Sequence, residues 1–332
     1  MRALLLLVSV LALLWAGYWF VGARATESAI ISWLDARKQE GWLAEVASVQ
    51  TKGFPNRFDT TLNDVRLADP NTGVAWTGPF LQILSLSYRP TQIIAVFPPT
   101  HSISSPNGTS HLTSSDFRGS LALEPDGHLG LQRFQFVVKD LNVESTASSS
   151  YNASEIRLAA RRSDNELPEY DIALEALNLA PQGALATLAQ SHDLPRDFRE
   201  LKVDTTILFD REWNRSALED SRPQPVEINL KKLKAEWGDL LIQVNGEVVI
   251  DEMGVGQGLV NLQIRNWRDV LELAVDAGLV PRRLHGSVEA SLGMLAGLSG
   301  NPKTIDTSIS VGDGVFYIGP VTLGEAPLFK IR

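Results

Sequence analysis

The stretch GEVVIDEMGVGQGLVNLQIRNW, residues 246–267, carries the pattern that decides the fold. In its second half Val260, Leu262 and Ile264 alternate with polar residues. A first apolar run precedes them, and a glycine-containing segment separates the two runs. A period of two is typical of a β-strand with one face in water and the other against apolar material. The glycines between the runs favour a hairpin turn.

Other parts of the chain show the same alternation of apolar and polar residues. They include residues 133–139, 201–209, 240–245 and 288–292. Antiparallel sheets commonly have one dry and one wet face, whereas parallel strands buried on both faces contain continuous apolar runs. The sequence therefore predicts a mainly β protein with curved, largely antiparallel sheets and a few short helices.

A weak internal repeat suggests two halves. Residues 119–140 align with residues 246–267 as a glycine, a short strand, an acidic turn and a longer strand. The repeat predicts two pseudo-repeated halves, at residues 48–180 and 181–332. A transmembrane anchor at residues 1–24 and a juxtamembrane helix at residues 25–41 would precede them.

The anchor is predicted from an uncharged apolar run, Ala3 to Ala23, between Arg2 and Arg24. About 20 helical residues span the hydrocarbon layer of a bilayer. A cleaved signal peptide is the alternative, with an A-x-A-like site ending at Ala25. Bulky aromatic residues and Arg24 near that site favour a retained anchor. With a short basic N-terminus inside, the bulk of the chain would face the periplasm, which predicts a single-pass inner-membrane protein.

Helices are expected to be few outside the anchor. Residues 183–192 and 266–279 have helical patterns, and the second begins with an asparagine cap and ends at a glycine. So few helices cannot cover one face of about a dozen strands. The sheet must therefore fold on itself, pack against another sheet, or leave an apolar concavity.

The composition excludes several classes of function. A net charge of −9 argues against a nucleic-acid partner. The absence of cysteine excludes disulfides, thiol nucleophiles and cysteine-based zinc sites. The five histidines lack metal-ligand spacing and are interpreted as surface or turn residues. We therefore predict no catalytic residues, no cofactor and no metal site, and a protein that is not an enzyme.

The motif GFPNRFD, residues 53–59, is the most unusual cluster in the chain. A glycine that allows positive φ and a proline that fixes φ predict a tight corner before a strand. In one interpretation the corner closes the end of the sheet with its two phenylalanines. In the other, its arginine contacts a ligand or partner, and the following aspartate either pairs with that arginine or accepts turn amides. The candidate positions are Gly53, Phe54, Pro55, Asn56, Arg57, Phe58 and Asp59.

On these residues the chain resembles an uncharacterised family of membrane-anchored envelope proteins, defined by a domain of unknown function and found mainly in alphaproteobacteria. The matching pieces are the anchor and residues 53–59, 73–98 and 312–329. More distantly, the layout is similar to AsmA-like proteins. That resemblance implies an inner-membrane helix followed by curved sheets with an apolar inner surface, linked to phospholipid movement or outer-membrane assembly. The chain is shorter than the large members of that group.

Two functional hypotheses follow. In the first, a membrane-anchored β groove shields acyl chains and assists lipid transport or envelope homeostasis, with Val244 and Leu262 among the groove positions. In the second, a closed β core makes a non-catalytic scaffold that binds another envelope protein through its polar faces and edges. The state of the apolar face distinguishes them, because a closed core leaves no open apolar surface.

Overall fold

A computed structural model describes residues 1–146, 150–181, 183–219, 221–298, 300–318 and 321–331. The chain divides into two compact units. Unit 1 contains residues 1–125 and 136–150, and unit 2 contains residues 126–135 and 151–332. The protein is mainly β, as predicted, and the strand pairings described within each unit are antiparallel. The two pseudo-repeated halves stay a prediction.

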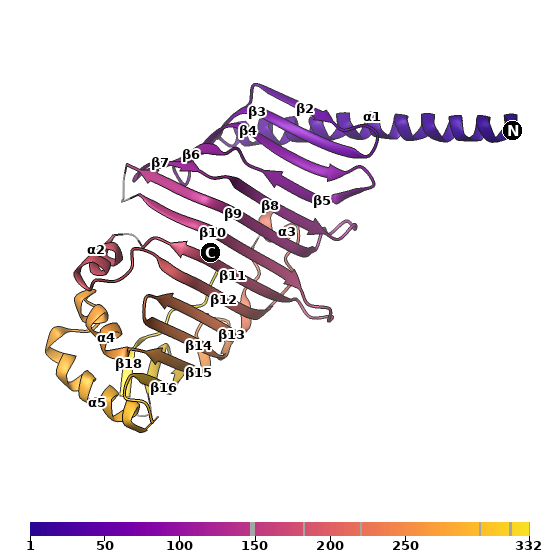
Figure 1. Ribbon diagram of the computed structural model, residues 1–332. Helices are drawn as coiled ribbons and strands as arrows, with labels where there is room; N and C mark the ends of the chain where they lie inside the picture. Colours follow the sequence, from indigo (N-terminus) through magenta and orange to yellow (C-terminus); the bar gives the residue numbers. More distant parts are fainter. Residues whose placement is uncertain (147–149, 182, 220, 299, 319–320, 332) are drawn as a thin grey trace. The chain divides into compact units, whose positions relative to one another are not determined.

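Unit 1 consists of one long helix and a set of antiparallel strands (Figure 1). Strand β9 (Leu131–Ser145) belongs to this unit from residue 136 onward. The other elements are α1 (Arg2–Gln39), β1 (Leu43–Glu45), β2 (Ser48–Lys52), β3 (Arg57–Asp69), β4 (Val74–Leu86), β5 (Arg89–Val96), β6 (Thr100–Ser105), β7 (Gly108–Thr113) and β8 (Asp116–Leu123).

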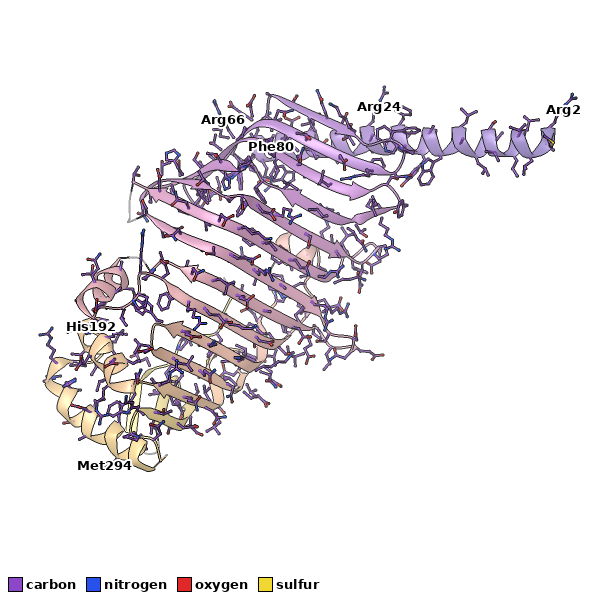
Figure 2. The ribbon with its side chains drawn as sticks, in the orientation of Figure 1. Arg2, Arg24, Arg66, Phe80, His192 and Met294 are labelled. Atoms are coloured by element: carbon purple, nitrogen blue, oxygen red, sulfur yellow. The ribbon has the colours of Figure 1, made fainter. Side chains whose placement is uncertain are left out.

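Helix α1 is continuous through both of the segments predicted as an anchor and a juxtamembrane helix. It is long and apolar enough to cross a membrane. Its first half extends beyond the strands of unit 1, from the labelled Arg2 toward Arg24 (Figure 2). The helix ends at Gln39, and Gly41 follows with φ +88°, a conformation that glycine adopts without strain.

From Trp15 onward, α1 packs on the segments that follow it. Trp19 and Ala23 form a buried cluster with Phe58, the second residue of β3. Phe58, Thr60 and Leu62 are buried alternate residues of that strand. The period of two in the sequence therefore matches one face of β3, and α1 covers part of it.

One prediction about the histidines is wrong, because His101 of β6 is only 4% exposed. Its ring centroid lies 6.0 Å from that of Trp76, 6.3 Å from Phe97 and 5.0 Å from Phe117. Burial lowers the pKa of His101 below 6.5, and a hydrogen bond to the carbonyl of Pro98 opposes that shift. Two of the three aromatic residues, Trp76 and Phe117, come from other strands, so the spacing of the histidines could not reveal this environment.

Unit 2 consists of long antiparallel strands, with helices α2, α4 and α5 gathered at one end of them (Figure 1). Its strands are β10 (Tyr151–Arg162), β11 (Glu169–Leu179), β12 (Phe198–Phe209), β13 (Pro225–Trp237), β14 (Leu240–Ile250), β15 (Gly256–Arg265), β16 (Thr304–Gly312), β17 (Val315–Ile318) and β18 (Val321–Glu325). Its helices are α2 (Ala184–Ser191), α3 (Ser216–Glu219), α4 (Trp267–Asp276), the 3₁₀ turn η1 (Arg282–Leu284) and α5 (His285–Leu298).

The hairpin predicted at residues 246–267 is present as β14 and β15. The strands pair in register from Leu241 opposite Arg265 to Ile250 opposite Gly256. A Cβ atom at Gly258 would lie 2.0 Å from the carbonyl oxygen of Glu247, so only glycine fits this close approach of the two strands. The glycine-rich segment therefore belongs to a hairpin, as predicted.

The predicted helices at residues 183–192 and 266–279 are confirmed as α2 and α4, but the strand predicted at residues 288–292 is wrong. That segment lies in α5. Val288, Leu292 and Ala296 pack toward the buried side chain of Trp267. Their spacing of four residues fits one face of a helix, and over five residues it is easily mistaken for a period of two.

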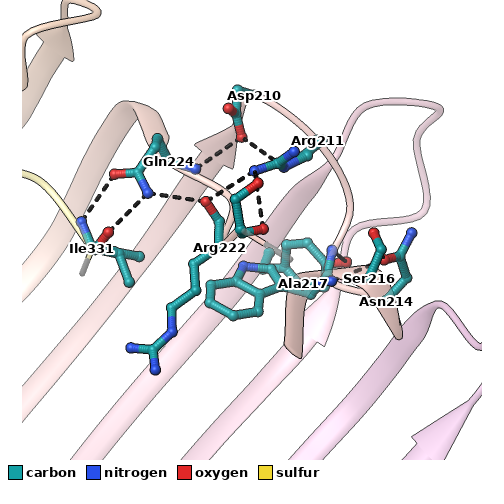
Figure 3. Close-up of polar contacts among 11 residues, drawn as sticks. Asp210, Arg211, Asn214, Ser216, Ala217, Arg222, Gln224 and Ile331 are labelled. Atoms are coloured by element: carbon teal, nitrogen blue, oxygen red, sulfur yellow. Dashed lines mark hydrogen bonds and ion pairs between the residues drawn. The ribbon is translucent and has the colours of Figure 1, made fainter. Parts of the chain in front are cut away.

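The segment after β18 is fastened to unit 2 by polar contacts (Figure 3). The side chain of Gln224 accepts a hydrogen bond from the backbone N–H of Ile331 and donates one to its carbonyl, both at 2.9 Å. The backbone N–H of Gln224 donates in turn to Asp210 at 2.8 Å. The phenyl ring of Phe329 lies against Gly256. These contacts hold residues 329–331 against the strands without regular pairing.

Candidate functional site

Two regions hold the positions singled out in the sequence. Val244 and Leu262 lie in unit 2 on β14 and β15, directly opposite each other. Residues 53–59 lie in unit 1, at the loop between β2 and β3 and the start of β3.

In unit 2, Val244 and Leu262 belong to a line of apolar residues that crosses six strands. Residues directly opposite each other in adjacent antiparallel strands share one face of a sheet. The successive opposite pairs from β10 to β15 define what we call the apolar row: Leu158, Leu174, Val203, Leu233, Val244 and Leu262.

The apolar row is not sealed from solvent. None of its six residues is buried, and Leu174 is 37% exposed. The neighbouring residues on the same strands point to the other face, which is polar. There Lys202 pairs with Glu175 at 3.4 Å, and Asn261 donates to Asn245 at 3.0 Å. The sheet thus has one wet face and one apolar face that helices cover only in part.

The helices cover the next line of residues along the same strands. Ile264 and Ile305 are packed under α4 and α5 against Trp267. Two residues before Val244, Ile242 lines a pocket with α2 and α4. The covered line and the apolar row therefore lie side by side on one face.

The pocket has a volume of about 230 Å³ and an entirely apolar lining. Its residues are Leu185, Leu188, Phe198, Ala235, Trp237, Leu240, Ile242, Val270, Leu273, Ala274, Ala277 and Leu279. An apolar cavity of about 150 Å³ stays dry and binds benzene. This pocket is therefore large enough for a somewhat longer piece of hydrocarbon, though not for a whole lipid.

Polar contacts join the two helices that line the pocket. His192 follows α2 and is labelled in Figure 2. Its Nε2 lies 2.9 Å from a carboxylate oxygen of Asp276 at the end of α4. Arg282 donates to the other oxygen of Asp276 at 2.9 Å. Leu279, which lines the pocket, is 79% exposed. A hydrogen-bonded link between two helices and an exposed leucine thus lie beside the pocket.

In unit 1, the motif GFPNRFD forms the predicted tight corner. Gly53 has φ +104°, and the Phe54–Pro55 peptide bond is cis. The N–H of Arg57 donates to the carbonyl of Gly53 at 2.9 Å, which closes the turn. Arg57 and Asp59 form an ion pair at 3.0 Å, one of the two arrangements expected for that aspartate. Asn56 is exposed.

The corner is docked on helix α1 by three aromatic side chains. The indole N–H of Trp15 donates to the carbonyl of Pro55 at 3.0 Å, and that of Trp19 to the carbonyl of Arg57 at 2.8 Å. The hydroxyl of Tyr18 donates to the carbonyl of Ser87 at 2.6 Å. We call residues 53–57 together with Ser87 and Tyr88 the foot of unit 1.

Ring contacts reinforce this docking. The ring centroid of Phe54 lies 5.5 Å from that of Trp19 and 5.9 Å from that of Phe20. Phe58 lies 6.0 Å from Trp19, and a Cβ at Gly22 would come within 2.6 Å of the Phe58 ring. The two phenylalanines of the motif therefore contact the helix. This helix-docking role was not predicted, and the predicted role in closing the end of the sheet stays a prediction.

Sequence reasoning missed both the partner of the motif and the pocket. The aromatic residues at the end of the apolar run were used only to favour a retained anchor, although Trp15 and Trp19 also carry the donors that the corner needs. The sequence predicted the helix at residues 266–279 that supplies several of the pocket residues. Nothing in their spacing showed that α2 packs beside them.

The comparisons with known proteins identify a family. The model of a family described as "Uncharacterized protein conserved in bacteria (DUF2125)" matches residues 19–327. No curated protein and no solved structure matches the chain. The resemblance to AsmA-like proteins stays a prediction.

Proposed function

The chain belongs to the DUF2125 family of bacterial proteins, and we propose that it is a membrane-anchored, non-catalytic protein whose apolar sheet face binds the acyl chains of lipids. In this proposal α1 holds the chain in the inner membrane, and the bulk of the chain faces the periplasm. The role would be to shield lipid tails during transport or envelope homeostasis. Membrane lipid is the partner.

The observation that carries this proposal is the open apolar surface of unit 2. The apolar row is half-exposed beside a pocket whose twelve lining residues are all apolar. Burial of hydrocarbon contributes about 0.8 kcal/mol per CH₂ group. A lipid tail that ends in the pocket and lies along the row would remove apolar surface of both partners from water. A closed scaffold core would not leave this row exposed.

A binding assay tests the proposal. The fluorescent C18 fatty acid cis-parinaric acid should bind the purified chain saturably, and native mass spectrometry should detect copurified phospholipid. Ala235 lines the pocket, so Ala235→Phe should fill it and weaken binding at least tenfold. The matched control is Ala173→Phe, because Ala173 is exposed and lies on the polar face opposite Asp204.

Two outcomes would contradict lipid binding at this face. One is the absence of saturable binding to the wild-type chain. The other is equal affinity in Ala235→Phe and the wild type, which would place any bound fatty acid elsewhere.

A further inference from the structure

The contacts between α1 and the foot conflict with a simple picture in which α1 alone crosses the bilayer. Residues 3–23 are uncharged and lie between Arg2 and Arg24. At 1.5 Å per residue they cover about 31 Å, close to the roughly 30 Å thickness of the hydrocarbon layer. The two arginines therefore mark its boundaries. Trp15 and Trp19 both lie inside these boundaries, and both bond to the foot.

The depth of the foot follows from these positions. Trp15 precedes Arg24 by nine residues, or about 13 Å along the helix axis. The part of the apolar run before Trp15, residues 3–14, covers only about 18 Å. That length is too short for the hydrocarbon layer. If α1 spans the bilayer, the foot must therefore extend below the membrane surface.

Five backbone carbonyls of the foot have hydrogen-bond partners, as a position inside the membrane requires. Irregular backbone is tolerated at membrane depth only where its polar groups find partners. Trp15, Tyr18 and Trp19 donate to three carbonyls of the foot, and the backbone of the foot supplies donors to two more. The five bonded carbonyls are those of Gly53, Pro55, Asn56, Arg57 and Ser87.

The exposed side chains of the foot have matching chemistry. Phe54 is 52% exposed and Tyr88 is 57% exposed, and the ring of Phe54 stacks on that of the exposed Phe20 of the helix. Exposed aromatic residues of this kind are enriched where a membrane meets water. The carbonyl of Arg57 is bonded to Trp19, and its side chain forms the ion pair with Asp59. The long arginine stem lets the charged groups reach toward the headgroups.

We propose that the foot of unit 1 is immersed in the bilayer leaflet from which α1 emerges, so that the sheet begins within the lipid. The occupant of this exposed aromatic surface is the lipid leaflet itself. The inference rests on the anchor of the proposed function, but not on lipid binding by unit 2.

The chain contains no cysteine, so single-cysteine variants carry a unique label. We would attach the fluorophore NBD to Phe54→Cys and Tyr88→Cys in phosphatidylcholine–phosphatidylglycerol vesicles and measure quenching by doxyl-labelled lipids. Leu14→Cys, within the apolar run, marks the membrane interior. Thr72→Cys marks water, because Thr72 is exposed in the turn at the opposite end of β3.

Labels at residues 54 and 88 should be quenched several-fold more than the label at residue 72, approaching the label at residue 14. If residue 14 is quenched while residues 54 and 88 behave like residue 72, the foot lies outside the membrane and the inference is overturned, although the anchor stands. If residue 14 is not quenched either, α1 is not in the bilayer, and the inference and the anchor of the proposed function both fail.

Discussion

The foot of unit 1 and the apolar row of unit 2 both present large apolar side chains, but only those of the foot are packed against a helix. At the foot, aromatic side chains of α1 contact the rings of the motif and donate to its carbonyls. In the apolar row, six apolar residues stand in register, and none is buried. The sequence thus identifies the apolar residues, whereas the surrounding helices and strands decide which of these residues are covered.

The largest expected effect compares the apolar row with the covered line beside it. Trp267 is 1% exposed, and its indole N–H donates to the carbonyl of Pro302 at 3.0 Å. Trp267→Ala should lower the free energy of unfolding by about 3–5 kcal/mol. Leu262→Ala, in the half-exposed row, should cost only about 1 kcal/mol. Urea unfolding followed by circular dichroism measures both. Similar losses of unfolding free energy in the two variants would mean that the apolar row is buried like the covered residues, and would contradict the contrast between them.

A smaller effect is expected at the docking of the foot. Gly22→Val should push the Phe58 ring out of place, because a Cβ at residue 22 would lie 2.6 Å from that ring. Overpacking of this kind costs about 1–3 kcal/mol, which should appear as a lower midpoint of thermal unfolding in detergent. Gly17→Val is the matched control on the same helix, since no atom of the described residues outside the helix backbone would lie within 4 Å of a Cβ at residue 17. Equal shifts in the two variants would show that the docking adds little stability.

The smallest effect concerns the polar face opposite the apolar row. Lys231, then Thr206, then Arg161 act by hydrogen bonding to Asp171 and lower its pKa from 3.8 to about 2. Because the folded-state pKa is depressed, the stabilisation is present above pH 3.8 and is lost as the pH falls toward 2. The pair is partly exposed to solvent, so it contributes less than about 1 kcal/mol.

The variant Asp171→Asn should unfold with a flatter dependence on pH between 4 and 2, and with nearly unchanged stability at pH 7. Chemical denaturation at a series of pH values measures this slope. A loss of several kcal/mol at neutral pH would show that the polar face contributes as much as a buried core, against the contrast drawn here.

The sequence by itself determined the helix α1, the mainly β fold and the wet and dry faces of the strands. These features depend on local periodicity, which a chain carries in the order of its residues. The periods of two in β12, β14 and β15 correspond to observed strands. The same reasoning failed at residues 288–292, because five residues are too few to separate a strand period from a helical one.

The tertiary structure decided which of these faces became covered. Residues 53–59 show an unusual corner, but their contacts with Trp15 and Trp19 join segments about 40 residues apart. The pocket likewise depends on α2 and α4, which are separated in the sequence by the four strands β12 to β15. Contacts between distant segments depend on the path of the whole chain. Local spacing therefore placed Val244 and Leu262 on the apolar face of their strands. Only the packing of the helices decided that they stay half-exposed.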